Sequence, residues 1–222
     1  MHLDQIKDKI PSKLYEAVAA AGVTELRPAQ VKSIHAGLLE GRNILVCTPT
    51  ASGKTLIAEL AAVSAILNLH GKAVYVVPLR ALASEKFNDF KKRYSSFIKV
   101  ALSIGDFDSS DPYLTDYDLI ICTAEKLDSL IRHHAPWIRM LSVVVIDEIH
   151  LLNDPDRGPT LEILITMLRQ LLPKSQLIGL SATIGNPEEL AKWLDAELVT
   201  DNWRPVKLHQ GVYRDGVISF KK

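Results

Sequence analysis

The sequence predicts an α/β fold in which a mostly parallel central sheet is flanked by helices. Short runs rich in β-branched residues recur along the 222-residue chain, and they are apolar almost throughout rather than at alternate positions. Such runs are typical of parallel strands that are covered on both faces. Between them lie stretches whose apolar residues recur at helical spacing, which is the alternation expected of an α/β domain. Hydrophobic residues make up 47% of the chain and charged residues 23%, which excludes a wholly disordered protein.

The predicted elements begin with helices over residues 3–40, which precede the first strand and are broken near Gly22 and Pro28. Strands are predicted at 43–47, 73–77, 99–103, 118–122, 142–146 and 176–180. The helix after the first strand is predicted from one apolar stripe, formed by Leu56, Leu60, Val63 and Leu67.

Two later helices have recognisable first residues. Pro159 is suited to the first turn of a helix with an apolar stripe of Leu161, Leu164, Ile165, Leu168 and Leu172. The last helix is predicted to begin at Asn186, an N-cap, followed by Pro187 and an acidic first turn. Past Trp203 the pattern changes to two strand-like runs, 206–213 and 217–220, with Asp215-Gly216 as a hairpin turn.

Domain organisation follows from these elements. We expect one domain over residues 1–200, with the leading helices 1–40 included, and a hairpin-like segment over residues 201–222. Because the chain ends directly after a strand-like run, we expect it to be a piece of a longer protein. The longest stretch without Asp, Glu, Lys or Arg, 175–187, is shorter than the about 18 apolar residues of a membrane span. The first residues carry charges and lack the apolar core of a signal peptide.

Composition limits the function classes further. Lys+Arg and Asp+Glu both number 26, so a wholly cationic nucleic-acid binder is excluded, although a local basic strip is not. Cys47 and Cys122 lie inside apolar runs, which predicts buried, reduced thiols in a cytoplasmic protein. The histidines show no metal-ligand spacing, and His133-His134 are adjacent on a predicted helix, so we predict no structural zinc.

A phosphate-binding loop is predicted directly after the first strand. The strand–loop–helix context supplies closely spaced backbone N–H groups and the positive end of a helix dipole. Gly53 allows the backbone to approach phosphates, Lys54 brings charge to the β- and γ-phosphates, and the Thr55 hydroxyl suits Mg²⁺. The literal pattern has Gly at its first position, where this chain has Thr48. The predicted nucleotide-binding residues of the loop are Thr48, Pro49, Thr50, Ala51, Ser52, Gly53, Lys54 and Thr55.

An acidic pair follows the apolar run 142–146. A carboxylate at the carboxyl end of a strand lies where open α/β sheets place their ligands. Asp147 suits a Mg²⁺ ligand, direct or through water, and Glu148 suits the base that orients and deprotonates an attacking water. Together with Lys54, these residues predict a Mg²⁺-dependent phosphoryl transfer by positioning and charge neutralisation. No arginine in the chain is obviously placed as an arginine finger.

On these residues the chain resembles a superfamily-two helicase. The box 147–150 is of the DExH type, and 26–30 resembles the adenine-reading Q motif, which ends at Gln30. Segments 77–82, 123–127 and 181–183 resemble motifs Ia, Ib and III. Within the superfamily, 47–55, Gly105-Asp106-Phe107-Asp108 and 202–206 are most similar to the Ski-two-like branch, and especially to the archaeal Hjm-type DNA repair helicases.

The resemblance implies the first RecA-like domain of an ATP-driven motor that moves 3′ to 5′ on single-stranded DNA and unwinds forks in repair. The implied partners are single-stranded or forked DNA and a second RecA-like domain of the same parent chain. Gln30 would contact adenine, and His150, Ser181 and Thr183 would couple the nucleotide site to nucleic acid. The nucleic-acid contacts would be Pro78, Arg80, Thr123 and Lys126. The chain alone is expected to bind ATP–Mg²⁺ weakly and to hydrolyse it slowly or not at all.

Several interpretations stay open from the sequence. A solvated helix face is favoured over a nucleic-acid contact for both Lys126 and the run 91–93, while Tyr94 and Phe97 are expected to anchor a helix end in the core. Trp193 and Trp203 are expected to be packing residues. The rivals for function are an RNA helicase of the same branch and a nucleotide-dependent binding module without turnover. A GTPase is disfavoured because the chain has no Asn-Lys-x-Asp signature.

Overall fold

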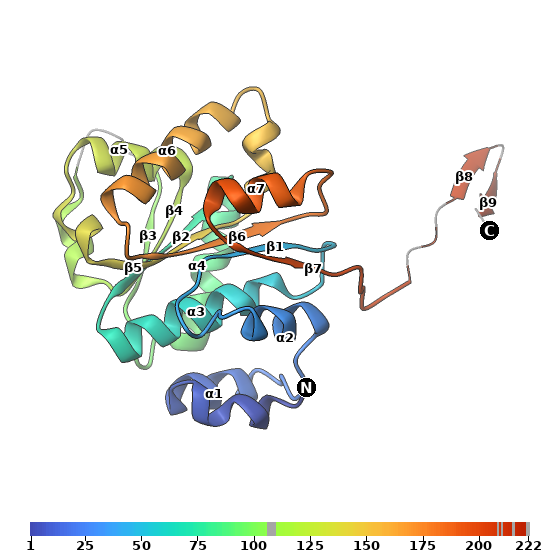
Figure 1. Ribbon diagram of the computed structural model, residues 1–222, viewed down its shortest axis with the longest axis horizontal. Helices are drawn as coiled ribbons and strands as arrows, with labels where there is room; N and C mark the ends of the chain where they lie inside the picture. The colour runs from blue at the N-terminus through green and yellow to red at the C-terminus, as the bar shows by residue number, and fades with distance from the viewer. Residues whose placement is uncertain (106–109, 208, 210, 215, 221–222) are drawn as a thin grey trace.

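A single parallel sheet of seven strands forms the centre of the protein in the computed structural model, which describes residues 1–105, 110–207, 209, 211–214 and 216–220 (Figure 1). The strand order is β3-β4-β2-β5-β6-β1-β7, and every pairing in the sheet is parallel. The strands are β1 (Ile44–Cys47), β2 (Lys72–Val77), β3 (Val100–Ser103), β4 (Leu119–Thr123), β5 (Leu141–Ile146), β6 (Gln176–Ser181) and β7 (Glu197–Thr200). The predicted α/β fold is confirmed.

Strands β1 to β6 lie where the apolar runs predicted them, within one residue at each end. The sequence analysis missed β7, which extends the sheet beyond β1 at its edge. Only Val199 of that strand is buried, so the segment lacks the continuous apolar run that marks the inner strands. Edge strands have one neighbour and need less apolar sequence, which is why this one carried a weak signal.

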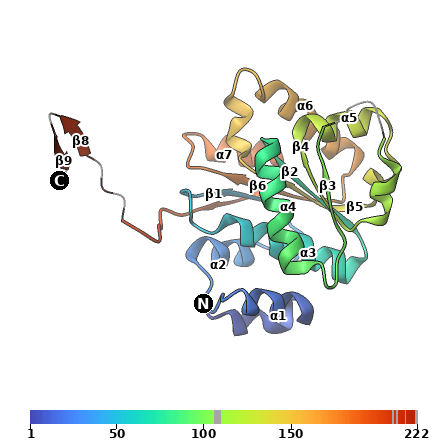
Figure 2. The ribbon, with the colours of Figure 1, turned by 180° about the vertical axis from the view of Figure 1, so that it is seen from behind.

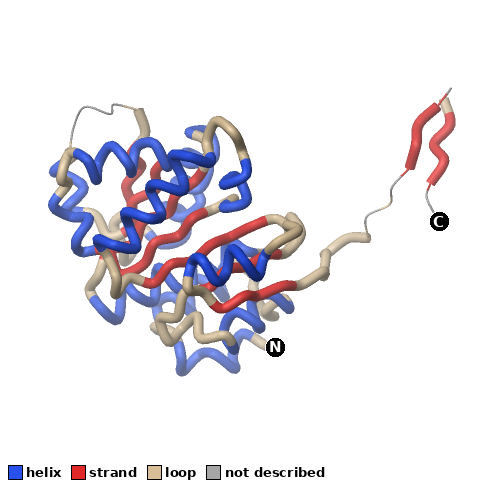
Figure 3. The backbone as a smooth tube through the Cα atoms, turned by 45° about the horizontal axis from the view of Figure 1, so that its top comes forward, coloured by secondary structure: helices blue, strands red, loops and turns tan. Residues whose placement is uncertain are grey.

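Helices cover both faces of the sheet and enclose two apolar cores. On one face lie α1 (Ser12–Ala20), α2 (Pro28–His35), α3 (Lys54–Leu69) and α4 (Arg80–Tyr94), and on the other α5 (Ala124–Arg132), α6 (Gly158–Leu171) and α7 (Pro187–Leu194) (Figures 1 and 2). Figure 3 shows the strands as one layer between the helices. The inner strands are buried on both faces, which accounts for their continuous apolar sequence.

Short 3₁₀ helices complete the chain. They are η1 (Leu3–Lys9), η2 (Pro112–Asp116), η3 (Pro136–Met140) and η4 (Ile149–Asn153). The predicted breaks in residues 3–40 are confirmed, because Gly22 follows α1 with a φ of +83° and Pro28 is the first residue of α2. We expected His133 and His134 to lie on a helix, but they do not. α5 ends at Arg132, and His134 has a left-handed φ of +54°.

The predicted caps differ in detail from the structure. Asn186 precedes α7, but its side-chain amide donates to Glu189 at 3.2 Å rather than capping the helix through a backbone N–H.

Cys47 and Cys122 are buried and free, and burial raises the pKa of the Cys122 thiol to about 12. Over the described part of the chain, the helices are too short or too polar to span a membrane.

The last described segment stands away from the body of the molecule as a separate two-stranded hairpin, β8 (Gly211–Arg214) and β9 (Val217–Phe220) (Figures 1 and 2). The antiparallel pairing confirms the predicted hairpin, and Gly216 in its turn has a φ of +81°. The predicted first strand was too long, because Val206 and Lys207 are not in a strand. The expected turn residue Asp215 lies outside the described residues.

Candidate nucleotide-binding site

The carboxyl edge of the sheet collects the predicted motifs. Because the strand pairs are parallel, the segments that follow β1, β2, β4, β5 and β6 leave the sheet at the same edge. They begin at Thr48, Pro78, Ala124, Asp147 and Ala182. Only β6 separates β1 from β5, so the phosphate loop and the acidic pair start roughly 10 Å apart, about two strand spacings.

The loop between β1 and α3 is held in shape by its own side chains. Thr48 is fully buried, and its hydroxyl lies 2.7 Å from the buried hydroxyl of Ser52. A glycine at the first position would lack this hydroxyl pair, which explains how Thr48 serves in its place. Ala51 has a left-handed φ of +65°, a conformation that costs a non-glycine residue roughly 1–2 kcal/mol.

Gly53 is required by its conformation and by its neighbours. Its φ is +91°, and a Cβ at this position would lie 2.6 Å from Nε2 of Gln30. The next residue, Lys54, begins α3 and folds back over the loop. Its ammonium donates to the carbonyl oxygens of Thr48 at 2.9 Å and Pro49 at 3.1 Å. Burial lowers the pKa of Lys54, and the charges of Glu148 and Asp147, which follow β5 at the same edge of the sheet, oppose that shift.

Asp147 is oriented by a buried tyrosine that sequence reasoning missed. Tyr75 on β2 is fully buried, and its hydroxyl donates to Oδ2 of Asp147 at 2.8 Å. Burial, the charge of Asp147 and this hydrogen bond hold the pKa of Tyr75 well above its usual value, and a hydrogen bond with Thr55 opposes them. The phenol is therefore a permanent donor. Because Thr55 also acts on the pKa of Tyr75, the two predicted metal ligands lie near the same phenol.

The oxygen atoms at this point suit Mg²⁺. Thr55 supplies a hydroxyl and Asp147 a carboxylate, both hard oxygen ligands. Magnesium in nucleotide sites is commonly held by one or two protein oxygens together with waters and phosphates, so a larger cage is not needed. Among the described residues, no group of three or more His, Cys, Asp or Glu side chains could hold a metal ion. Lys86 of α4 donates to Oγ1 of Thr55 at 2.8 Å, a contact that no local sequence pattern predicts.

Glu148 has an unusual backbone and a histidine neighbour. Its φ is +52°, a strained left-handed conformation for a glutamate. Nδ1 of His150 lies 3.3 Å from Oε2 of Glu148 and 3.4 Å from the backbone nitrogen of Ala182. Nδ1 carries either a proton or a lone pair, so it can serve only one of these two partners at a time. His150 thus stands between the acidic pair and the segment after β6.

The other predicted coupling residues differ in exposure. Ser181 is fully buried at the end of β6, and its carbonyl oxygen accepts a hydrogen bond from the backbone N–H of Thr48 at 3.3 Å. Thr183 is exposed two residues later. The end of β6 therefore contacts the phosphate loop through the Ser181 carbonyl, and the next residue, Ala182, lies within hydrogen-bond distance of His150.

Gln30 joins α2 to the phosphate loop. It is 3% exposed, accepts a hydrogen bond from the backbone N–H of Arg27 at 2.8 Å, and donates to the Gly53 carbonyl at 2.9 Å. A cavity of about 450 Å³ lies beside it, lined by Gly22, Val23, Thr24, Glu25, Arg27, Gln30, Gly53, Thr55, Leu56, Glu59, Lys86, Asp89 and Arg93. Space for a nucleotide base is thus present next to Gln30.

Trp203 is not the packing residue that we expected. It is 38% exposed, and the Arg27 guanidinium lies 5.4 Å from its ring centroid. The same Arg27 donates to the carbonyl oxygen of Ala51 at 2.7 Å, so the tryptophan is linked to the phosphate loop. Trp193 of α7 is half-buried and packs against the apolar core, as expected.

The predicted nucleic-acid residues do not share one exposed surface. Arg80 is exposed at the start of α4 and Pro78 is half-buried, whereas Thr123 is buried and accepts the backbone N–H of Lys126 at 3.3 Å as the N-cap of α5. Lys126 is 2% exposed and forms an ion pair with Asp111 at 2.9 Å. The solvated-face interpretation is therefore wrong for Lys126, and a contact with nucleic acid would require this ion pair to open.

The run 91–93 is only partly solvated. Lys91 and Lys92 are exposed, but Arg93 forms an ion pair with the buried Glu59, which also accepts the Tyr94 hydroxyl at 2.5 Å. Tyr94 is fully buried and Phe97 packs on the core, which confirms both as anchors of a helix end. The expected turn at Gly105-Asp106 is described only at Gly105, with a φ of +106°, because 106–109 lie outside the described residues.

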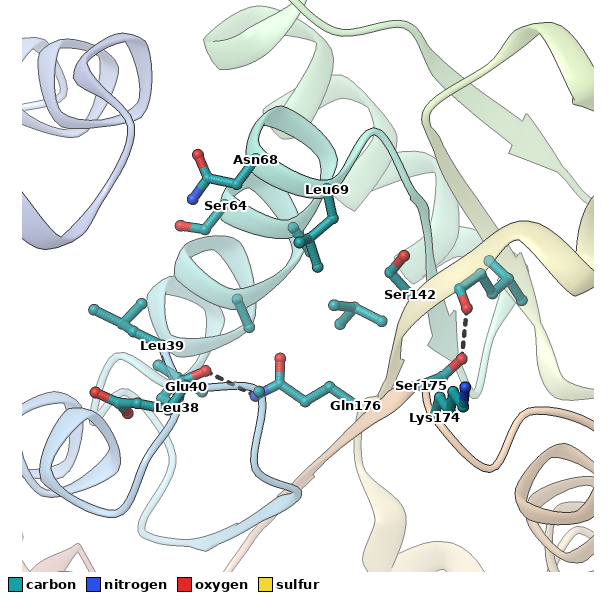
Figure 4. Close-up of a pocket in the computed structure, with 15 residues that line it drawn as sticks. Leu38, Leu39, Glu40, Ser64, Asn68, Leu69, Ser142, Lys174, Ser175 and Gln176 are labelled. Carbon is teal, nitrogen blue, oxygen red and sulfur yellow. Dashed lines mark hydrogen bonds between the residues drawn. The ribbon is translucent and has the colours of Figure 1, made fainter.

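A second cavity, of about 390 Å³, lies where the strands of the sheet begin, opposite the carboxyl edge (Figure 4). It is lined by the start of β5 and β6 and by the last turns of α3, with Ser64, Asn68, Ser142 and Gln176 among its residues. The amide of Gln176 donates to the carbonyl oxygens of Leu38 and Arg42. None of the predicted site residues lines this cavity, so it is separate from the nucleotide site.

Comparison with known proteins finds a helicase family model and helicase relatives. Residues 27–190 match the family described as DEAD/DEAH box helicase. The ATP-dependent DNA helicases Hel308 of Pyrococcus horikoshii and Pyrococcus abyssi are 53% and 54% identical over 210 and 209 residues, which cover 95% and 94% of this chain. The Hel308 of Methanocaldococcus jannaschii is 53% identical over 215 residues, or 94% of the chain. The chain spans 29% of the length of each Pyrococcus protein and 18% of the third.

Two solved structures of a helicase are also similar to this chain. The crystal structure of the DUF1998 helicase MrfA bound to DNA matches with a TM-score of 0.76 and 28% identity, covering 87% of this chain and 30% of that one. The structure of MrfA bound to DNA and AMPPNP has the same TM-score and identity, and covers 87% of this chain and 29% of that one.

Proposed function

This chain belongs to the DEAD/DEAH box helicase family, and on that premise we propose that it is the ATP-binding motor domain of a DNA helicase. The observation that carries the proposal is the meeting of Lys54, Thr55 and Asp147–Glu148 at one edge of the sheet. The Hel308 relatives are ATP-dependent DNA helicases by name, and MrfA was solved with DNA and AMPPNP, which supports ATP and DNA as ligands.

The phosphate loop binds the triphosphate in this proposal. The Lys54 ammonium leaves the carbonyl oxygens of Thr48 and Pro49 and moves to the β- and γ-phosphates, which hold it more strongly because they are negatively charged. Thr55 and Asp147 would hold Mg²⁺, and Tyr75 orients the carboxylate of Asp147. Magnesium, when bound, neutralises charge that develops on the phosphates.

Hydrolysis requires one positioned water. Glu148 accepts a hydrogen bond from that water and takes its proton as the oxygen attacks the γ-phosphorus and the bond to the β-phosphate oxygen breaks. ADP and phosphate are the products. The contact between Glu148 and His150 provides a route by which the acidic pair responds to the segment 181–183.

The nucleic-acid side of the proposal rests on resemblance. We propose that single-stranded or forked DNA binds along the segments that contain Pro78, Arg80 and Thr123. The motor moves 3′ to 5′ on this DNA and acts in DNA repair and replication-fork processing. Domain boundaries of 1–200 and 201–222, and a second RecA-like domain in the parent protein that completes the ATP site, belong to the same proposal. The same proposal implies that the protein acts in the cytoplasm.

Binding of a fluorescent ATP analogue in the presence of Mg²⁺ tests the assignment of roles. Lys54→Ala is expected to abolish binding, and Glu148→Gln to leave it intact while removing turnover, because only the base is lost. Lys92→Ala, an exposed lysine on α4, is the matched control for removal of a positive charge. Loss of binding in Glu148→Gln would reject the role of Glu148 as the base.

The choice of nucleic acid is tested by turnover in the full-length gene product. ATP hydrolysis is measured with single-stranded DNA and RNA of equal sequence. The proposal predicts stronger stimulation by DNA, and stronger stimulation by RNA would identify an RNA helicase. Absence of turnover with either polymer would favour a nucleotide-dependent binding module.

A further inference from the structure

Lys86 occupies an unexpected place in the candidate nucleotide site. It lies on the second turn of α4, and its ammonium donates to Oγ1 of Thr55 at 2.8 Å. The same ammonium is 5.8 Å from the ring centroid of Tyr75, whose hydroxyl binds Asp147. A positive charge therefore sits against the oxygen that is proposed to bind magnesium, and beside the ring of the tyrosine that binds the Asp147 carboxylate.

Two cations cannot comfortably share this position. A hydroxyl oxygen has two lone pairs, but a lysine ammonium at hydrogen-bond distance and Mg²⁺ at about 2.1 Å would bring like charges within a few ångströms of each other. In a partly buried site such repulsion is only weakly screened. Metal binding at Thr55 therefore requires the Lys86 ammonium to move away.

We propose that Lys86 is a place-holder cation, a positioning residue that keeps the Thr55 hydroxyl in place while magnesium is absent and must leave before the metal binds. The inference rests on the proposed nucleotide site. By competing with the metal, Lys86 sets the Mg²⁺ concentration at which the metal–nucleotide complex forms. The side chain acts through Thr55 and takes no part in the chemical step.

The site offers the displaced ammonium another position. Lys86, Glu59, Asp89 and Arg93 line the same cavity of about 450 Å³. The charge of Lys86 already acts on the buried carboxylate of Glu59, which is bound by Tyr94 and Arg93. A rotation of the flexible lysine side chain toward these two carboxylates keeps it paired after the metal arrives. Exchange is thus possible without unfolding any part of α4.

The test is a magnesium titration of nucleotide binding. Binding of a fluorescent ADP analogue is followed as Mg²⁺ is added to the wild-type chain, to Lys86→Met, and to Lys86→Gln as a second neutral variant. Both variants are expected to need on the order of tenfold less Mg²⁺ for half-maximal binding, because the competing charge is gone. Lys92→Met, which removes an exposed charge of the same helix, is expected to match the wild type.

Each result of the titration supports or overturns the proposed role of Lys86. An unchanged half-saturating Mg²⁺ concentration in both Lys86 variants would overturn the proposal and leave Lys86 as a packing residue. A higher concentration would overturn it too, and would make Lys86 a support for the metal ligand. If the wild-type chain bound no nucleotide at all, the proposed function itself would fail, which is a separate result. Thermal melting of each variant confirms that it is folded.

Discussion

Removal of the Tyr75 hydroxyl is the most informative single change in the site. Tyr75 is fully buried, and its hydroxyl donates to Asp147 at 2.8 Å. Its pKa is held well above the usual value, first by burial and then by the charge of Asp147, so the phenol remains protonated across the working pH range. Tyr75→Phe removes this donor while keeping the ring, whose edge-on contact with Phe90 has a centroid separation of 5.5 Å.

The expected cost follows from the kind of bond that is lost. A hydrogen bond to a charged group contributes about 1.5–3 kcal/mol, and the carboxylate of Asp147 is left in a partly buried place without this donor. Urea unfolding of Tyr75→Phe should therefore show a decrease of about 1.5–3 kcal/mol in the free energy of unfolding, with an unchanged m value. Because Asp147 loses its orientation, half-maximal nucleotide binding should also require more Mg²⁺.

Tyr15→Phe is the matched control for this change. Its hydroxyl donates to Asp4 at the exposed surface, and its loss should change stability little and nucleotide binding not at all. The reasoning would be refuted if Tyr75→Phe unfolded at the wild-type urea concentration and kept the wild-type dependence on Mg²⁺. Tyr75 would then be a packing residue of the core and no more.

Three further outcomes are expected from the same contacts. Gly53→Ala should lose nucleotide binding and about 1–3 kcal/mol of stability, because the new Cβ would lie 2.6 Å from the Gln30 side chain and the φ of this residue is +91°. Its control is Gly22→Ala, which has a φ of +83° and open space around it, and which should cost about 1 kcal/mol of stability and keep nucleotide binding. Asp111→Ala should cost about 3 kcal/mol in urea unfolding by leaving the buried Lys126 charge without this carboxylate, and Lys126→Met in the same chain should restore part of it; equal losses in both would contradict this. Since burial raises the pKa of Cys122 to about 12, its thiol stays protonated at pH 8, and mass spectrometry should detect alkylation by iodoacetamide only in denaturant.

The sequence predicted the sheet well because its inner strands are buried on both faces. Their continuous apolar runs could belong to no exposed element, and the intervening helices carried regular stripes. β7 was missed because a half-exposed edge strand needs only one buried residue, Val199. The predicted hairpin was confirmed, but its first strand was predicted too long, since Val206 and Lys207 are not in a strand.

The candidate site could be predicted only where a local motif carries the chemistry. Lys54, Thr55, Asp147 and Glu148 follow strands at positions that the parallel topology brings to one edge. Contacts between distant segments left no local signal.

Tyr75 was hidden in a run of strand residues, and Lys86 was one lysine among several on α4. The opposite error concerned Lys126, whose charge suggested a surface that the ion pair with Asp111 removes.

A crystal structure of the chain with Mg²⁺ and a non-hydrolysable ATP analogue tests the central claim most directly. The account predicts one metal between the Thr55 hydroxyl and the Asp147 carboxylate, the Lys54 ammonium on the β- and γ-phosphates, and Lys86 turned away from Thr55. A triphosphate bound elsewhere, for example in the cavity at the opposite edge of the sheet, would contradict it. So would a metal held by the phosphates with neither Thr55 nor Asp147 near it.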